Sequence, residues 1–173
     1  MTDTMSAEQR HQCMASVHSK DTKPEMLVRR FLFSRGFRYR LHVRSLPGSP
    51  DIVLPKYKTV IFVNGCFWHG HDGCPLHRVP KSNVEFWVSK IEKNKKRDQR
   101  EYSLLKKMGW KVLLVWECQL RPFCKKDTLE YLVYTLSEIL LDKYRIKSYQ
   151  PDIDSLESVA ESVVEYGSED TGK

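Results

Sequence analysis

The pattern of apolar and polar residues predicts three helices. Residues 22–36 begin with Thr-Lys-Pro-Glu, which combines an N-cap, a proline in the first turn and a glutamate at the third helical position. Residues 82–109 begin with a second capping sequence, Ser-Asn-Val-Glu, and both segments end at a glycine. A third segment, residues 127–144, has amphipathic spacing and begins at an aspartate that is suited to cap it.

Four other segments predict β-strands. Residues 38–43 and 51–54 are short and are separated by a turn rich in glycine and proline. Residues 59–63 and 110–116 are continuous apolar runs, which are typical of strands buried on both faces of a sheet. Because helices and strands intermix along the chain, we expect an α/β fold with a mixed central sheet flanked by helices.

Composition divides the chain into three parts. Residues 1–20 are polar and lack a sustained period, so we expect an N-terminal arm, whereas residues 21–150 hold enough apolar material for one domain. Residues 151–173 form a tail that carries seven acidic residues and one lysine, so the net charge of +7 becomes +13 when the tail is left out. This basic excess favours a nucleic-acid partner, and the alternative is a solvated basic surface that only aids solubility.

The apolar residues and the cysteines also restrict the class of protein. The chain has no apolar run of about 20 residues and no apolar leader, so we expect a cytoplasmic protein that is not embedded in a membrane. Its five cysteines are an odd number, and without an export signal they favour free thiols or metal ligands over a disulfide framework.

A glycine-rich loop after the third predicted strand contains candidate metal ligands. Cys66, His71 and Cys74 lie within nine residues, and thiolate and imidazole are the ligands that zinc prefers. We favour Cys118 as the fourth ligand because it follows the last predicted strand, and parallel strands end at the same edge of a sheet; His77 and Cys124 are the alternatives. Four protein ligands would make a closed, structural zinc site. The alternative is an ordinary loop without metal, but three possible ligands within nine residues, flanked by glycines, favour zinc.

Two carboxylates and a histidine are candidates for phosphodiester chemistry. Asp51 stands at the start of a short strand, where it could hold Mg²⁺ against a phosphate, although an aspartate in a turn is more often a turn residue. Glu25 already has a structural role in the capping sequence. His69 lies between two predicted zinc ligands and could be a ligand itself, but the turn allows it to point away from His71 and act as a general base.

Large aromatic residues stand beside the predicted metal site. Phe67 and Trp68 follow Cys66 in an otherwise polar loop, and Trp87 lies near the start of the second predicted helix. From the pattern alone we favour packing in the core. The alternative is insertion of these rings between DNA bases.

Several motifs together give a resemblance to a known family. KDTKPE, LPGSPDIVL, VIFVNGCFWHGH, EFW…KIEKNKKRD and GWKVLLVWEC occur in unbroken order over about residues 5–120. They resemble the very short patch repair (Vsr) endonucleases. The resemblance implies a restriction-endonuclease-like fold and an enzyme that nicks DNA on the 5′ side of the thymine in a T:G mismatch, which arises when 5-methylcytosine is deaminated beside a cytosine methyltransferase.

The resemblance also implies roles for individual residues. Asp51 becomes the Mg²⁺ ligand, His69 the general base, and Glu25 a supporting residue near the scissile phosphate. The structural zinc takes Cys66, His71, Cys74 and Cys118. Four residues match positions that family members insert into DNA beside the mismatch, which reverses the preference for core packing: Met14, Phe67, Trp68 and Trp87.

The chain departs from the family pattern at two places. Val63 and Asn64 stand where the pattern has Thr-His, and the loop to Cys74 is one residue longer. A contact from the main-chain carbonyl of Val63 to Mg²⁺ does not depend on the side chain. Asn64 takes the place of a histidine that helps at the phosphate, so it is the catalytic candidate whose chemistry differs from the pattern.

The resulting hypothesis is Mg²⁺-dependent hydrolysis of one DNA strand that leaves a 5′-phosphate. Basic residues of the second helix would contact phosphates without reading sequence; they are Lys93, Lys95, Lys96 and Arg97. We expect a bacterial monomer whose partners are mismatched duplex DNA, a cognate cytosine-5 methyltransferase system and mismatch-repair proteins. The rival hypotheses are a zinc-stabilised DNA-binding module without catalysis and a restriction or junction nuclease of the same fold. A zinc hydrolase of small molecules is the weakest, since a closed site has no open position.

Overall fold

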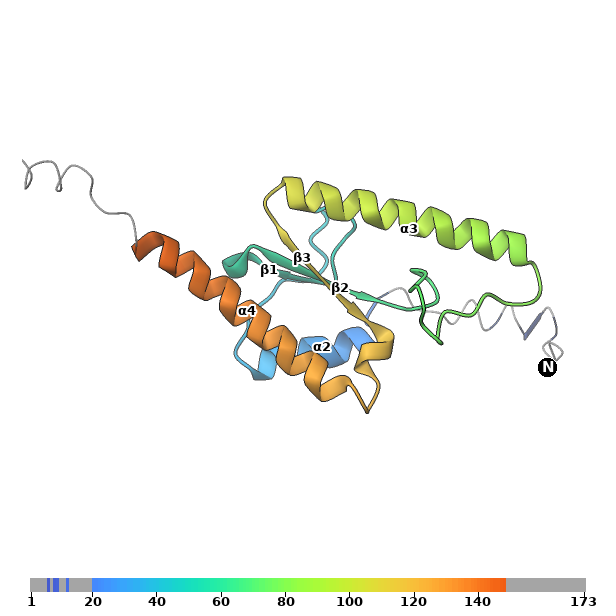
Figure 1. Ribbon diagram of the computed structural model, residues 1–173, viewed down its shortest axis with the longest axis horizontal. Coiled ribbons are helices and arrows are strands. Elements are labelled where there is room, and N and C mark those ends of the chain that lie inside the picture. The colour runs from blue at the N-terminus through green and yellow to red at the C-terminus, as the bar shows by residue number, and fades with distance from the viewer. Residues whose placement is uncertain (1–5, 7, 10–11, 13–19, 149–173) are drawn as a thin grey trace, which may run out of the picture. The chain divides into compact units, whose positions relative to one another are not determined.

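The computed structural model describes residues 6, 8, 9, 12 and 20–148 (Figure 1). The chain divides into two compact units, Met1–Val133 and Tyr134–Lys173, and the first of these contains the sheet. Met14 and the predicted acidic tail lie outside the described residues. Within the described residues, no helix is both long and apolar enough to cross a lipid bilayer.

Helix α2 spans Lys23–Ser34 and begins as the sequence predicts. The side chain of Thr22 accepts a hydrogen bond from the backbone N–H of Glu25 and donates to its carboxylate, at 3.4 and 2.8 Å. The first bond gives a partner to a backbone N–H in the first turn of the helix, which would otherwise lack one. The predicted cap is therefore confirmed. The helix ends before Gly36, whose φ of +86° is a left-handed conformation that glycine adopts without strain.

Three strands form one small mixed sheet in the order β1-β2-β3. Strand β1 (Ile52–Leu54) pairs antiparallel to β2 (Thr59–Asn64), and β2 pairs parallel to β3 (Lys111–Trp116). Every residue of β2 is buried, as its continuous apolar sequence predicts for a central strand. A short 3-10 turn, Pro55–Tyr57, closes the β1–β2 hairpin. The expected mixed α/β architecture is therefore present.

Two strand predictions are wrong in part. Residues 38–43 do not form a strand, and only Arg40 makes a single bridge to Val53. His42 has a φ of +52°, which interrupts the extended backbone. The prediction that 110–116 is buried on both faces is also wrong, because β3 is the edge of the sheet and only Val115 is fully buried. An apolar run therefore identified the strand but not its position in the sheet.

Helix α3 spans Val84–Lys107 and lies on the opposite side of the sheet from α2 (Figure 1). The predicted second cap is wrong: Asn83 is the N-cap, its φ is +53° and its side chain makes no capping hydrogen bond. The predicted end is confirmed, since Gly109 follows with a φ of +77°. Leu105 of α3 packs in a buried cluster with residues of the sheet and the preceding loop, namely Leu46, Val53, Val60 and Phe62.

Strand β3 leads directly into a 3-10 segment, Glu117–Leu120, and then into helix α4, Lys125–Ser148. Helix α4 begins two residues before Asp127, so Asp127 lies in its first turn and is not the predicted cap. A carboxylate there still interacts favourably with the positive end of the helix dipole. The 3-10 segment matters for function because it places Cys118 beside the end of β2.

Candidate active site and metal centre

Four of the predicted metal ligands converge at the parallel ends of β2 and β3. The ligand atoms of Cys66, His71, Cys74 and Cys118 all lie within 4.8 Å of one another. His71 Nδ1 is 3.5 Å from Cys66 Sγ and 3.4 Å from Cys118 Sγ. The two alternatives, Cys124 and His77, are not part of this cluster, and Cys124 is exposed. The reasoning from parallel strand ends therefore identified the fourth member of the cluster.

The geometry of this cluster fits a tetrahedral zinc ion. A nitrogen about 2.0 Å and a sulfur about 2.3 Å from zinc in a tetrahedron lie about 3.5 Å apart, which is close to the 3.5 and 3.4 Å that separate His71 Nδ1 from the two sulfur atoms. Burial raises the pKa of the Cys66 thiol to about 12, and the pKa of Cys118 is raised for the same reason. Burial also opposes the ionisation of Cys74, but hydrogen bonds from the backbone N–H of Leu76 and from the neighbouring thiols outweigh it and lower the pKa of this thiol. Ionisation of Cys66 and Cys118 beside it therefore requires a cation that neutralises their charge. The donor set is that of a structural metal site.

Helix α3 holds in place the loop of residues 65–74, which carries Cys66, His71 and Cys74. Gly70 has a φ of +61°, and a Cβ there would lie 2.7 Å from Ile91 and 2.8 Å from Lys95. The side chain of Asn94 donates to the carbonyl of Trp68 at 3.0 Å. On the other side of the loop, the ring of His71 stacks on Trp116 with a centroid distance of 4.1 Å. The loop is therefore fixed between α3 and the end of β3.

A cleft of about 770 Å³ is bordered by the loop of residues 65–74, and its walls contain the predicted catalytic residues. The walls include Glu25, Asp51, Val63, Asn64 and His69. Asp51 Oδ2 accepts a hydrogen bond of 2.7 Å from the backbone N–H of Val63, which fixes the carboxylate at the mouth of the sheet. Because the cleft also reaches Trp68, the candidate chemistry and one of the predicted wedge residues share a surface.

Burial raises the pKa of Asp51 from its ordinary value to about 6. The hydrogen bond from Val63 opposes this shift, and the negative charge of Glu25 adds to it. Among the described residues, no partner is found for the second oxygen of Asp51. Burial penalises the charged form of this carboxylate, and a divalent cation bound to its second oxygen would offset that penalty. Asp51 is therefore suited to bind such a cation.

Glu25 is buried and held by three neighbours. Its carboxylate accepts from Thr22 and from the backbone N–H of Asp21, and it pairs with Arg29 at 2.9 Å. Arg29 also pairs with Asp21 and lies 3.5 Å from the carbonyl of Asp51. The capping residue predicted from the sequence thus also belongs to the wall of the cleft. Arg29 was missed, although its i+4 spacing from Glu25 is a signal that would have found it.

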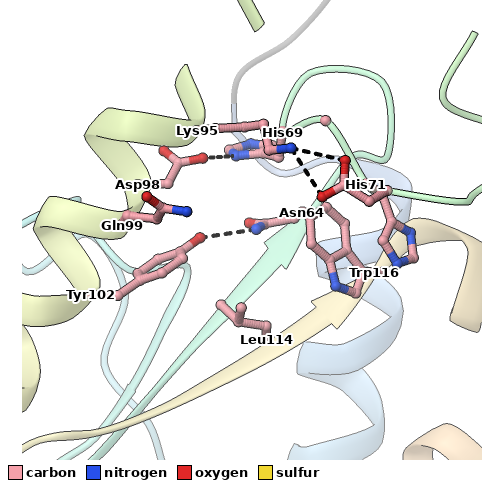
Figure 2. Close-up of a pocket in the computed structure, with 11 residues that line it drawn as sticks. Asn64, His69, His71, Lys95, Asp98, Gln99, Tyr102, Leu114 and Trp116 are labelled. Atoms are coloured by element: carbon pink, nitrogen blue, oxygen red, sulfur yellow. Dashed lines mark hydrogen bonds and ion pairs between the residues drawn. The ribbon is translucent and has the colours of Figure 1, made fainter. Parts of the chain in front are cut away.

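His69 points toward α3, away from His71 (Figure 2). Its Nδ1 lies 2.5 Å from Asp98 Oδ2. Burial opposes the ionisation of Asp98, but hydrogen bonds from His69 and Arg97 outweigh it and hold the pKa of this carboxyl below its ordinary value. An ionised Asp98 places the proton of the neutral imidazole on Nδ1 and leaves Nε2 as the proton acceptor. Nothing in the sequence pattern distinguished Asp98 from the other polar residues of α3.

Asn64, the last residue of β2, is buried and donates a hydrogen bond of 2.9 Å to the hydroxyl of Tyr102 (Figure 2). The ring of Tyr102 packs on Phe62 with a centroid distance of 4.9 Å. Both residues line the cleft together with His69. Sequence reasoning singled out Asn64 but missed Tyr102.

The three predicted aromatic residues form one half-exposed cluster. Phe67, Trp68 and Trp87 meet with centroid distances of 5.1, 5.3 and 6.0 Å. They are not sealed in the core, and the edge of the cluster continues to the exposed ring of Phe86. The fourth predicted wedge residue, Met14, lies outside the described residues.

The predicted phosphate-contacting residues all lie on α3. Lys93 and Lys96 are exposed. Lys95 pairs with Asp72 at 2.9 Å, and Arg97 pairs with Asp98 at 2.8 Å while lining the cleft. The first two are therefore available to a polyanion, whereas the other two already have acidic partners.

Comparison with known proteins gives the family. The sequence model of the family described as DNA mismatch endonuclease Vsr matches residues 2–75. The type II nicking enzyme V.NmeAIP of Neisseria meningitidis serogroup A is 53% identical over 121 residues, which cover 70% of this chain and 86% of the relative. The chain belongs to the Vsr family of DNA mismatch endonucleases.

Other members support the same assignment. The DNA mismatch endonuclease Vsr of Escherichia coli K12 is 44% identical over 138 residues, which cover 80% of this chain and 87% of the relative. The type II nicking enzyme V.XorIIP of Xanthomonas oryzae is 52% identical over 120 residues, which cover 69% of this chain and 88% of the relative. The resemblance found in the sequence is confirmed, and this Vsr-family chain is a DNA endonuclease that hydrolyses phosphodiester bonds.

Proposed function

We propose that the chain nicks one strand of duplex DNA on the 5′ side of the thymine in a T:G mismatch, by Mg²⁺-dependent hydrolysis, in very short patch repair of deaminated 5-methylcytosine. The observation that carries the proposal is one cleft lined by Asp51, by His69 with its partner Asp98, and by Trp68. A cation-binding carboxylate, a general base and a wedge for the base stack are the parts that this reaction needs.

The chain's residues would divide the reaction between them. Asp51 and the main-chain carbonyl of Val63 would hold Mg²⁺, with Glu25 in a supporting position, and the bound ion would supply positive charge against the phosphate. His69 takes a proton from the attacking water at Nε2, while Asp98 keeps its Nδ1 protonated and its ring oriented. The bond to the 3′ oxygen breaks and the 5′-phosphate remains on the downstream strand.

The second metal has a structural role in this proposal. Zn²⁺ is held by Cys66, His71, Cys74 and Cys118, and the closed set of four ligands leaves no position for substrate. It would brace the loop that carries His69, Phe67 and Trp68. In this proposal the small mixed sheet is the centre of a restriction-endonuclease-like fold.

DNA recognition would combine wedging and charge. Phe67, Trp68 and Trp87, with Met14, enter the base stack beside the mismatch, where stacking is weakest and opening costs least. Basic residues of α3 contact phosphates without reading sequence; those proposed are Lys93, Lys95, Lys96 and Arg97. We further propose that the protein acts as a cytoplasmic monomer in bacteria and works with a cognate cytosine-5 methyltransferase system and mismatch-repair proteins.

The test of this function is a nicking assay with end-labelled duplexes that carry a T:G mismatch, a matched T:A pair or a branch. The expected result is a single nick 5′ of the mismatched thymine that requires Mg²⁺. Equal cutting of matched or branched DNA would indicate a restriction or junction nuclease instead. Binding without any nick would indicate a DNA-binding module.

Replacement of His69 by alanine should lower the nicking rate by about 10²- to 10⁴-fold, since that is the usual contribution of a positioned general base. Zinc content, measured by metal analysis, should stay at the parental value because His69 points away from the cluster. The matched control is His77→Ala, which removes a histidine outside the cluster and the cleft. Loss of zinc from His69→Ala would make His69 a ligand and contradict its proposed role.

Replacement of Phe67 by alanine should weaken discrimination between mismatched and matched duplexes by about tenfold. The salt-dependent affinity for matched DNA should change little, because that affinity comes from phosphate contacts. Both affinities can be measured by fluorescence anisotropy at two salt concentrations. Phe123→Ala is the control, since this phenylalanine is 96% exposed and far along the chain from the aromatic cluster. An equal loss for both duplexes would remove the wedge role of Phe67.

A further inference from the structure

The Asn64–Tyr102 pair has features that the reaction proposed above does not use. Asn64 ends β2 and is only 3% exposed, and its amide donates to the Tyr102 hydroxyl at 2.9 Å. Tyr102 comes from α3, and its ring packs on Phe62 of the same strand. Two elements therefore fix the position of one phenol oxygen, whereas most long polar side chains of α3 are exposed.

The direction of this hydrogen bond leaves the phenol with an unused proton. Because the Tyr102 oxygen accepts from the Asn64 amide, its own O–H is available to donate. Among the described residues, no carbonyl or side chain accepts it. Burial raises the pKa of Tyr102 to about 12, and the nearby charges of Asp98 and Asp51 also raise it, so the phenol keeps its proton at neutral pH.

The surroundings favour an anionic oxygen as the missing acceptor. Asn64 and Tyr102 line the same cleft as Asp51 and His69, and they also line a smaller cavity of about 310 Å³ that continues past His69 (Figure 2). The cleft is lined by Lys20 and Arg97, whose positive charges attract an anion, and by five carboxylates, whose charge a divalent cation at Asp51 would offset in part. The Tyr102 hydroxyl is a neutral donor, so it adds no charge to the cleft. It can donate to a phosphate oxygen once the phosphate is bound beside it.

We propose that Tyr102, positioned by Asn64, donates its O–H to a non-bridging oxygen of the scissile phosphate. Tyr102 is thus a catalytic residue of this chain, and Asn64 is a positioning residue that acts through it. The inference rests on the proposed nicking reaction and assigns a transition-state contact within that same cleft. A hydrogen bond to a charged group contributes more than one between neutral groups, so its loss should be visible in the rate.

The first measurement is the single-turnover nicking rate of Tyr102→Phe, which removes only the hydroxyl. We expect a rate about 10- to 100-fold lower, with the dissociation constant for the duplex within about threefold of the parent. Tyr57→Phe is the matched control, because its ring packs on Phe37 outside the cleft, and it should nick at the parental rate. A Tyr102→Phe rate within threefold of the parent would overturn the proposal.

The second measurement identifies the atom that Tyr102 contacts. Each of the two phosphorothioate diastereomers at the scissile position replaces one non-bridging oxygen by sulfur, which is a weaker acceptor. For one diastereomer we expect the parent to slow by about tenfold and Tyr102→Phe to be affected less than about twofold. If both diastereomers slow the parent and the variant equally, Tyr102 does not touch the phosphate and the proposal fails.

The third measurement separates the two residues. Asn64→Ala should slow nicking by a similar factor, and the double variant should be no slower than Tyr102→Phe alone, because both changes remove one interaction. Additive losses would overturn the positioning role of Asn64. All rates are measured on whichever mismatched duplex the parent nicks, so a preference for a mismatch other than T:G overturns the proposed function and leaves this test intact.

Discussion

The variant Asp51→Asn should lose nicking activity by at least about 10³-fold while it still binds mismatched DNA. The amide keeps an oxygen that can accept from the backbone N–H of Val63, so local structure is preserved. What is lost is the negative charge that holds Mg²⁺, and with it the charge neutralisation on which metal-assisted hydrolysis depends. Single-turnover nicking with saturating enzyme, together with anisotropy binding in Ca²⁺, measures both quantities.

The same variant should be more stable than the parent when no divalent cation is bound. Burial raises the pKa of Asp51 to about 6, so the folded state prefers the protonated form and ionisation at higher pH costs folding free energy. The penalty begins to build above the unfolded value near pH 4 and is complete above about pH 6. Asp51→Asn should therefore gain about 1–3 kcal/mol at pH 7.5 and about half of that at pH 5.

Thermal unfolding in chelator-free, magnesium-free buffer at the two pH values tests this stability gain. The control is Asp127→Asn, which removes a carboxylate from the first turn of α4 outside the cleft. It should not produce the same pH-dependent gain. Residual Mg²⁺-dependent nicking by Asp51→Asn above one-hundredth of the parental rate would show that the cation is held elsewhere.

Replacement of Cys118 by serine should remove the zinc ion and destabilise the fold by about 4 kcal/mol or more, since binding free energy at a structural zinc site is folding free energy. For a chain of this length, that loss lowers the unfolding midpoint by about 10 °C or more. The nicking rate should fall as well. His69 lies between Cys66 and His71 in the chain, so loss of the ion that these two residues bind would release the loop that positions His69. Metal analysis and calorimetry measure the two effects.

Cys124→Ser is the matched control for this experiment. Cys124 is six residues further along the chain, is exposed and lies outside the cluster, so zinc content and unfolding midpoint should both match the parent. If Cys124→Ser loses zinc and Cys118→Ser keeps it, the fourth ligand is wrongly assigned. If Cys118→Ser keeps the zinc content and the unfolding midpoint of the parent, Cys118 is not a ligand of a structural metal.

Local sequence signals predicted local structure well where the signal involved neighbours along the chain. The cap at Thr22 and the glycine after α3 are set by hydrogen bonds or backbone angles within a few residues, so the local sequence contains the cause. The strand Thr59–Asn64 was predicted from its continuous apolar run, although its burial also depends on pairing with β3. The second cap failed because Asn83 adopts a left-handed conformation, which a matching set of residue types does not reveal.

Position within the sheet was harder to predict than the strands themselves. The run that became Lys111–Trp116 has the apolar content of a buried strand, yet it forms the edge of the sheet. The alternating segment around Arg40 pairs through one bridge because His42 leaves the extended region. Periodicity reports which side chains avoid water, whereas the number of pairing partners depends on how the remaining chain packs.

By itself, the sequence determined the family, through motifs that occur in order over about residues 5–120, and three members of the metal cluster, because Cys66, His71 and Cys74 lie within nine residues. The resemblance to that family supplied the residues expected to act in the cleft. Only the tertiary structure decided the partners of those residues. Asp98 and Tyr102 reach the site from α3, 29 positions after His69 and 38 positions after Asn64 respectively. A helix pattern states that some face packs inward, but the rotation of α3 over the loop, which follows from core packing around Leu105, selects the side chains that meet the cleft.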